Sequence, residues 1–344
     1  KEKESMLRFD NEYYQNVIKE HHYDPMDFNP IDFSLNQISS RNLQYKWLCH
    51  YKGNAFAEAL RSNKNCIVTT GIGLSGTPHL GTLSQILRAI FLQQNGLKVQ
   101  IVLGDLDSYN ARNQPLDIVL ERAERYRDFI KKLGFNDTQG ILRSQYNNEQ
   151  ILKTAYLISK SLKDKDFKEA EEDLSELYQR KGIYPGIEFP VKQAILLMTA
   201  DFIHLGKENG YSNVLIMLGL EEHLYVQIAN KVVDRMQYPF TISSMYSRII
   251  KGFNGYPKMS KSIPESSITV DMPFEQMYDI ILNQEGDYDS PMDSVVYQMM
   301  CAVSYYSPDE LDRLYDICKE KGKKWQESKK QYVNMLFGIC KKWQ

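Results

Sequence analysis

Two short stretches of this sequence combine residue types that suit the chemistry of phosphate groups. The first runs from Gly71 to Thr82 and reads Gly-Ile-Gly-Leu-Ser-Gly-Thr-Pro-His-Leu-Gly-Thr. Its glycines let backbone approach a ligand closely, and the N–H groups of a following helix attract an anion. His79 can donate to a phosphate oxygen, and Gly81 leaves room for a flat adenine ring. The alternative interpretation of this stretch is a plain tight turn.

The second stretch, Lys258-Met259-Ser260-Lys261-Ser262, follows Gly255 and Pro257 in a predicted loop. Two lysines on either side of a serine can close over a ligand as a cationic clamp. Such a clamp would neutralise the negative charge that builds up on a leaving pyrophosphate.

The elements that must position these stretches follow from apolar periodicity. Short β-branched or apolar runs predict strands at 66–70, 98–103, 140–142 and 213–218. Helical spacing predicts helices at 83–94, 115–133, 147–181, 191–205 and 221–236. Alternation of strands and helices is typical of an α/β fold with a doubly wound parallel sheet. We therefore expect an N-terminal extension (1–62), a Rossmann-like catalytic domain (63–272, helical insertion at about 147–205) and an all-helical C-terminal domain (273–344).

The two stretches together resemble a known pair of motifs. Pro78-His79-Leu80-Gly81 is similar to the HIGH motif of class I aminoacyl-tRNA synthetases, and residues 258–262 match the KMSKS motif of that family. Within class I, the chain most resembles the tryptophanyl and tyrosyl branch, above all tryptophanyl members of archaeal and eukaryotic type. Three further stretches carry this likeness: 189–201, 219–226 and 234–239.

The resemblance implies ATP-dependent activation of an aromatic amino acid, tryptophan favoured, as an adenylate, and its transfer to tRNA by a homodimer. ATP with Mg²⁺ is the implied cofactor, and no metal site built by the protein is expected. The implied catalytic residues are His79, Lys258 and Lys261. The implied ATP-binding residues are Gly71, Gly73, Ser75, Pro78, His79, Gly81, Thr82, Met259, Ser260 and Ser262. The implied amino-acid-binding residues are Asp105, Asp107, Gln193, Asp201, Gly219, Glu221 and Glu222.

Physical arguments accompany four of the amino-acid-binding residues. Asp105 and Asp107 follow the strand at 98–103, at the edge where doubly wound sheets bind ligands. They can contact the amino acid or a magnesium ion, or cap the next turn. Gln193 and Asp201 lie about two helical turns apart, so we expect them to share a face and hold an α-ammonium group. A solvated helix face is the alternative.

The chain departs from the family pattern where Glu221 and Glu222 stand in place of an Asp-Gln pair, and Ala229-Asn230-Lys231 in place of Thr-Arg-Asp. These departures keep two alternatives open. One is a paralogue that activates tyrosine or another amino acid for an acceptor other than tRNA. The other is an inactive paralogue that senses amino acids or binds RNA.

Composition sets the remaining expectations. The net charge of −2 argues against nonspecific binding of polyanions by the whole chain. Residues 319–342, however, hold eight lysines and two glutamates. This stretch is either a solvated helix face or a surface that contacts RNA. No apolar run of about 18 residues predicts a membrane span, and the polar N-terminus predicts no secretory signal. Five widely spaced cysteines favour a reducing, cytoplasmic location.

Overall fold

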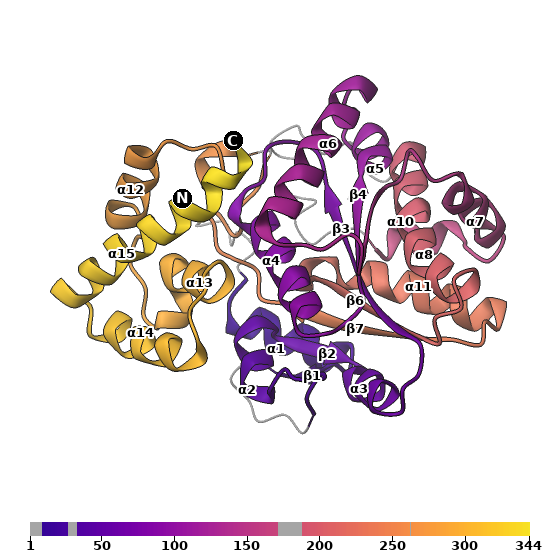
Figure 1. The fold of residues 1–344 in the computed structure, drawn as a ribbon, viewed down its shortest axis with the longest axis horizontal. Coiled ribbons are helices and arrows are strands. Elements are labelled where there is room, and N and C mark those ends of the chain that lie inside the picture. Colours follow the sequence, from indigo (N-terminus) through magenta and orange to yellow (C-terminus); the bar gives the residue numbers. More distant parts are fainter. Residues whose placement is uncertain (1–8, 27–32, 171–187, 262) are drawn as a thin grey trace, which may run out of the picture.

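A seven-stranded sheet with the order β1-β2-β7-β6-β3-β4-β5 forms the centre of the molecule (Figure 1). The computed structural model describes residues 9–26, 33–170, 188–261 and 263–344. Five strands run parallel: β3 (Cys66–Gly73), β4 (Val99–Gly104), β5 (Ile141–Ser144), β6 (Asn213–Gly219) and β7 (Thr241–Ser247). This parallel order confirms the predicted α/β, doubly wound class.

The segment before residue 62 extends this sheet. After helix α1 (Asn11–Glu20), strands β1 (Asp24–Pro25) and β2 (Cys49–Tyr51) join it antiparallel, with β2 beside β7. Helices α2 (Ser40–Lys46) and α3 (Gly53–Arg61) complete the segment. Neither β1, β2 nor β7 was expected from the sequence.

Helices cover both faces of the sheet because its strands alternate apolar side chains between them. Val68 of β3 packs in one core cluster with α3, α4 (Leu80–Gln94) and α6 (Leu116–Leu133). Ile67 packs in a second cluster with α1, α7 (Glu149–Ser159), α10 (Phe189–Lys207) and α11 (His223–Met236). The short helices α5 (Asp105–Ala111) and α8 (Asp164–Lys168) lie beside α10 and α11 in Figure 1. Among the described residues, no helix is long and apolar enough to cross a membrane.

The winding reverses between β3 and β6, which are adjacent in the sheet. The chain leaves β3 toward α4 on one face. It leaves β6 through the 3₁₀ turn η1 (Leu220–Glu222) into α11 on the other. The carboxyl ends of β3 and β6 therefore diverge, and a crevice at such a switch point is where doubly wound sheets bind ligands.

Residues 273–344 contain no strand in any part that the structure describes. They form α12 (Phe274–Asn283), α13 (Val295–Ala302), α14 (Pro308–Glu320) and α15 (Gly322–Cys340), together with the 3₁₀ turns η3 (Pro291–Asp293) and η4 (Lys341–Trp343); η2 (Pro264–Ser266) precedes them. The end of the chain returns to the sheet domain, where the Trp343 ring packs edge-on against Tyr126 and Phe129 of α6.

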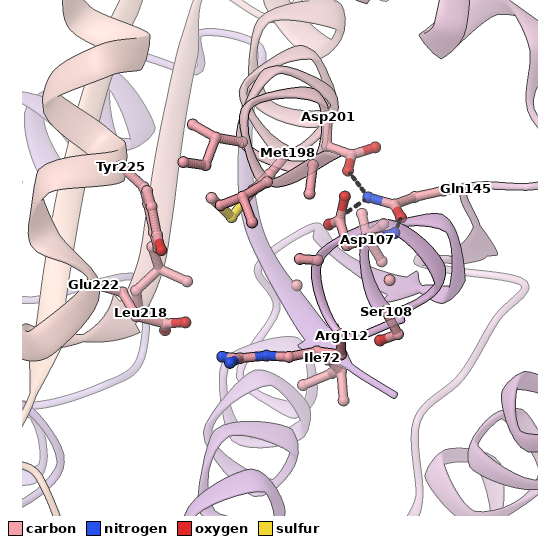
Figure 2. A pocket seen from close by; sticks show the side chains of 18 of the residues that line it. Ile72, Asp107, Ser108, Arg112, Gln145, Met198, Asp201, Leu218, Glu222 and Tyr225 are labelled. Atoms are coloured by element: carbon pink, nitrogen blue, oxygen red, sulfur yellow. Dashed lines mark hydrogen bonds between the residues drawn. The ribbon is translucent and has the colours of Figure 1, made fainter. Parts of the chain in front are cut away.

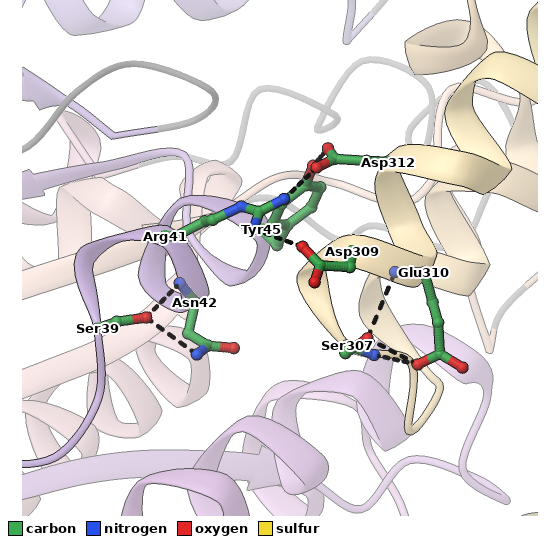
Figure 3. A network of polar contacts seen from close by, with 8 residues as sticks. All are labelled: Ser39, Arg41, Asn42, Tyr45, Ser307, Asp309, Glu310 and Asp312. Carbon is green, nitrogen blue, oxygen red and sulfur yellow. Dashed lines mark hydrogen bonds and ion pairs between the residues drawn. The ribbon is translucent and has the colours of Figure 1, made fainter.

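A polar network ties α2 to the helical C-terminal part (Figure 3). The Arg41 guanidinium donates to Asp309 at 2.5 Å and also to Asp312, which accepts a further hydrogen bond from the Tyr45 hydroxyl. These contacts join residues more than 260 positions apart in the chain. They are exposed, so we assign them to positioning the two parts rather than to stability.

The boundaries of several predicted elements change. Strand β3 continues through Gly71 to Gly73, β5 ends at Ser144, and α10 begins at Phe189. The predicted helix at 147–181 is interrupted between α7 and α8, and its end from 171 onward lies outside the described residues.

Candidate functional site

Two adjoining cavities occupy the crevice at the carboxyl ends of the parallel strands. Their volumes are about 220 Å³ and about 210 Å³. They share the residues Gly71, Gly73, Ser75, Arg112 and Glu222. One ligand can therefore reach from the first cavity into the second across the end of β3.

The first cavity has apolar walls and an acidic end. The walls come from Ile72, Val102, Ala194, Ile195, Met198, Phe202, Leu218 and Tyr225. Figure 2 shows Asp107, Gln145 and Asp201 gathered on one side, with Tyr225, Glu222 and Leu218 opposite. This combination suits a ligand with a large apolar group and a cationic or hydrogen-bond-donating group.

Gln145 links the two carboxylates at the acidic end. Its Nε2 donates to Asp107 Oδ2 at 2.7 Å and to Asp201 Oδ2 at 2.9 Å, while its Oε1 accepts from the backbone N–H of Asp107 at 3.1 Å. The other oxygen of Asp201 pairs with Arg143 at 2.7 Å. The negative charge of Asp201 is therefore balanced by the guanidinium of Arg143.

The carboxyl group of Asp107 has fewer stabilising partners than that of Asp201. Burial, and the negative charge of Asp201 nearby, raise the pKa of the Asp107 carboxyl well above its usual value. Its buried Oδ1 has no hydrogen-bond partner among the described residues. A buried acceptor without a partner costs free energy, so a ligand ammonium or N–H group placed there would be bound favourably.

Asp105 serves the backbone rather than the cavity wall. Its Oδ1 accepts hydrogen bonds from the N–H groups of Leu106, Gln145 and Tyr146, at 2.8 to 3.1 Å. These bonds join the start of α5 to the loop after β5 and thereby place Gln145. Asp105 is fully buried, and burial raises the pKa of its carboxyl despite the backbone donors.

The second cavity is rich in cations. Its charged lining consists of His79, Arg88, Arg112, Arg248, Lys258 and Lys261 with the acids Glu221 and Glu222. Arginine and lysine side chains in such a concave site bind phosphate groups through charge-assisted hydrogen bonds. The excess of cations over acids suits a polyanion such as a triphosphate.

The glycine stretch forms the floor between the cavities. A Cβ atom added at Gly71 or Gly73 would meet nothing within 4 Å, so bare backbone faces the ligand space there. At Gly81 the added Cβ would lie 2.7 Å from Cε1 of His79. Gly81 is therefore required by the His79 ring itself, which is a nearer reason than the adenine expected from the sequence.

His79 is set up as a neutral donor. It caps α4, and its Nδ1 accepts from the N–H of Thr82 at 3.3 Å, so the ring proton must sit on Nε2. Burial, with the positive charges of Lys261 and Lys258, holds the pKa of His79 well below its usual value. A neutral imidazole with Nε2–H can still donate to an oxyanion.

The lysine loop lies across the second cavity. Lys261 Nζ donates to the carbonyl of Gly73 at 2.6 Å, and Lys258 Nζ lies 3.6 Å from Glu221 Oε1. The residues between them are buried, and the N–H of Ser260 donates to Ser266 Oγ at 3.0 Å. Ser262 lies outside the described residues.

The structure brings together most of the residues predicted for the site. The second cavity collects those predicted for ATP, including Ser75, Thr82, Met259 and Ser260, and also Gly219 and Glu221, which were predicted for the amino acid. Pro78 is buried beside it and accepts from the N–H of Val270 at 2.9 Å.

Gln193 is placed differently. Its side chain is exposed, whereas Asp201 is buried, so the expectation that they share a face of α10 is wrong. Eight residues correspond to a rotation of about 80° beyond two full turns, which separates the two side chains. Gln145 takes the position beside Asp201 that Gln193 was expected to hold.

The lining residues that were missed from the sequence include Arg88, Arg112, Gln145, Tyr225 and Arg248. Gln145 and Arg248 directly follow the ends of β5 and β7. Correct strand ends would therefore have pointed to both, since ligands bind at that edge. Within the described ranges, no three His, Cys, Asp or Glu side chains are grouped to hold a metal ion.

Comparison with known proteins identifies the family to which the chain is similar. The family described as tRNA synthetases class I (W and Y) matches residues 61–341. The tryptophan–tRNA ligase of Thermoplasma acidophilum is 26% identical over 234 residues, which cover 67% of this chain and 50% of the ligase. The tyrosine–tRNA ligase of Methanopyrus kandleri is 26% identical over 209 residues, 60% of each chain. The chain thus spans about half to 60% of the length of these curated relatives.

The fold also matches solved structures. The crystal structure of tryptophanyl-tRNA synthetase from Aeropyrum pernix K1 superimposes with a TM-score of 0.77 at 19% identity, covering 97% of this chain and 92% of that one. At this identity the likeness concerns the fold alone, while the family match covers most of the sequence. The chain belongs to the class I tRNA synthetases of the W and Y family.

Proposed function

We propose that this protein activates an aromatic amino acid, with tryptophan favoured, as its adenylate and transfers it to tRNA. The observation that supports this most is the pair of adjoining cavities. One is apolar with an acidic end, and the other is cationic. An aminoacyl-adenylate has the same sequence of groups: ammonium and apolar side chain first, phosphate second. Tryptophan is favoured because more of the similar curated proteins are named as tryptophan–tRNA ligases than as tyrosine–tRNA ligases.

In the proposed reaction, the carboxylate of the amino acid attacks the α-phosphorus of ATP in line. An O–P bond forms, the bond to the bridging oxygen breaks, and pyrophosphate leaves with that electron pair. A carboxylate is already a nucleophile, so no general base is required. The residues of the second cavity would position the triphosphate and stabilise charge on the leaving group.

Mg²⁺ is proposed to enter with ATP as the counterion of its phosphates. The second cavity offers Glu221 and Glu222 as carboxylates, while the rest of its charged lining consists of His79 and cations. Carboxylate oxygens together with phosphate oxygens form the usual ligand set of Mg²⁺ in nucleotide sites.

The direct test is ATP–pyrophosphate exchange with each of the twenty amino acids in turn. We expect exchange with tryptophan, or with tyrosine as the second candidate. Charging of the matching tRNA then tests the acceptor. Exchange without charging would favour the paralogue with another acceptor, a reading that the Glu221-Glu222 departure supports. No exchange with any amino acid would contradict the proposed function.

We expect His79→Ala to reduce kcat of exchange about tenfold while changing the binding of ATP less. The reason is that a neutral Nε2–H aimed at developing negative charge acts mainly in the transition state. Kinetics at varied ATP separate the two effects, and His79→Asn keeps a donor for comparison. A change confined to the KM for ATP would contradict this role for His79.

Residues 273–344 are proposed to act as the tRNA-contacting, anticodon-binding type of domain. In α15 the apolar residues at 333, 336 and 340 are buried, whereas Lys323, Lys324 and Lys330 are exposed. Lys329 is the exception, since it is buried and pairs with Glu285 at 3.1 Å. The exposed lysines can therefore contact phosphates without disturbing the core of the domain.

Replacing Lys323, Lys324 and Lys330 by glutamine should weaken tRNA binding and leave amino-acid activation unchanged. The slope of log affinity against log salt should flatten by up to about one unit per lost phosphate contact. The measurement is tRNA affinity across a salt series. A variant with Lys19, Lys64 and Lys98 neutralised, all exposed elsewhere, controls for total charge. Equal affinity and slope in the triple-glutamine variant and the wild type would show that these lysines only form a solvated helix face.

A homodimer in the cytosol completes the proposal. Helix α7 exposes Leu152 and Tyr156, one helical turn apart, with Tyr156 80% exposed. An apolar face of this kind is suited to a second copy of the chain. The five cysteines are all free thiols, which is the state that a reducing compartment maintains.

A further inference from the structure

Two arginines that belong to neither motif lie in the wall of the cationic cavity. Arg88 is on the third turn of α4, and Arg248 directly follows β7. Both also line a smaller cavity behind this wall, between the end of α2 and helix α13. They therefore lie between the nucleotide space and the helical C-terminal part.

Arg88 is held in one orientation. Its Nε donates to the backbone carbonyl of Lys46 at 2.9 Å, and its Nη1 donates to Ser84 Oγ at 3.0 Å. Only 6% of its surface is exposed, and burial lowers the pKa of its guanidinium to about 10. A cation this deeply buried costs free energy unless anionic partners balance it.

Arg248 is supported by helix α1. Its guanidinium lies over the ring of Tyr14 in α1, 4.7 Å from the ring centroid. The Tyr14 hydroxyl accepts from the N–H of Ile249 at 3.3 Å, which fixes the backbone next to the arginine. Both arginines are thus supported by residues before position 62.

The surroundings of the two arginines already hold one negatively charged side chain, Glu221. The Glu221 carboxylate lines the same cavity, 3.6 Å from Lys258 Nζ, and its charge raises the pKa of Arg88 against the effect of burial. Its Oε2 is buried without a hydrogen-bond partner in the part of the chain that the structure describes. With Glu222, two carboxylates stand against the five arginine and lysine side chains that line this cavity, which leaves capacity for phosphate oxygens.

We propose that Arg88 and Arg248 are two further ligands of the ATP triphosphate, preformed in the free enzyme and supported by the N-terminal segment. This rests on the proposed function. The guanidinium fork suits phosphate oxygens, and a fixed fork loses little entropy on binding. The arginines would bind ground state and transition state alike, whereas the lysine loop would act mainly on the leaving pyrophosphate.

The test compares binding of ATP, pyrophosphate and AMP to Arg88→Gln, Arg248→Gln and wild type by titration calorimetry. AMP lacks the β- and γ-phosphates. We expect the affinity for ATP and for pyrophosphate to fall about tenfold per variant, and the affinity for AMP to change less than about twofold. In exchange assays the KM for ATP should rise while kcat stays within about threefold. Arg61→Gln, an exposed arginine on α3, is the matched control.

Because Arg88 is buried, Arg88→Gln can fail to fold, and the half-buried Arg248 then decides. Tyr14→Leu tests the support: it should reproduce part of the Arg248→Gln effect, and Tyr14→Phe, which keeps the ring, less of it. Equal losses for ATP and AMP, or no loss for ATP, would overturn the inference. The binding comparison tests the two arginines and does not depend on turnover. Exchange activity of the wild type tests the proposed function, so the two can fail independently.

Discussion

Replacing Lys261 by alanine is expected to lower the rate of ATP–pyrophosphate exchange by about 10²-fold or more, with the fold intact. Lys261 Nζ reaches across the cavity to the Gly73 carbonyl, and its stem lies 3.7 Å from where a side chain at Gly76 would begin. The amine therefore already lies in the cationic cavity. Loss of a cation that stabilises charge on the leaving group removes transition-state binding. The measurement is kcat of exchange at saturating ATP and amino acid.

The same lysine should give exchange a dependence on pH. Burial, with Arg122 and Arg112, lowers the pKa of Lys261 to about 7. Phosphate groups favour the charged amine, so ATP binding should take up a proton above this pH. kcat/KM for ATP should therefore fall as pH increases beyond about 7, and Lys261→Ala should lose this dependence.

Lys261→Arg, which keeps the charge, should retain more activity than Lys261→Ala, and Lys64→Ala on the exposed surface serves as the control. A rate for Lys261→Ala close to that of wild type would remove the clamp role. Equal thermal stability of the variants shows that any loss is chemical and not structural.

The fold was predictable where burial and periodicity coincide. Strands β3, β4 and β6 are rich in β-branched and apolar residues and are buried along nearly their whole length, because both faces of a parallel sheet are covered. Strand β7 was missed because it buries Ser243 and Ser244, which read as loop residues. Ser243 is accommodated by donating to the Lys52 carbonyl at 2.9 Å. Such a partner, 191 positions away, is invisible to local patterns.

The candidate site divides in the same way. Motif residues such as His79 and Lys261 were predicted because their local spacing is informative. Arg88 and Gln145 were not, because their place in the site depends on packing between distant segments: Arg88 on Lys46, and Gln145 on Asp107 and Asp201. Glu221 was predicted for the amino acid and lines the cationic cavity, since η1 turns it toward Lys258.

Asp107→Asn should reduce kcat/KM for the amino acid about 10²-fold and leave the KM for ATP nearly unchanged. The substitution keeps the shape of the side chain but removes the charge that would bind the α-ammonium group, and charge-assisted hydrogen bonds in buried sites have effects of this size. The affinity of wild type for the amino acid should fall as pH drops through the raised pKa of Asp107, because the protonated carboxyl no longer attracts an ammonium. The variant should lose that dependence.

Stability separates this role from a structural one. The folded state binds the Asp107 proton more tightly than the unfolded state, so ionisation of Asp107 destabilises the fold as pH rises through its raised pKa. Asp107→Asn removes this cost and should be as stable as wild type or more stable at neutral pH. Asp105→Asn is the contrasting variant: it weakens three backbone hydrogen bonds, so its main effect should be a lower Tm. If Asp107→Asn lost stability while keeping its amino-acid affinity, the unpartnered oxygen of Asp107 would not be the ammonium site, and Asp201 or Glu222 would be the next carboxylate to test.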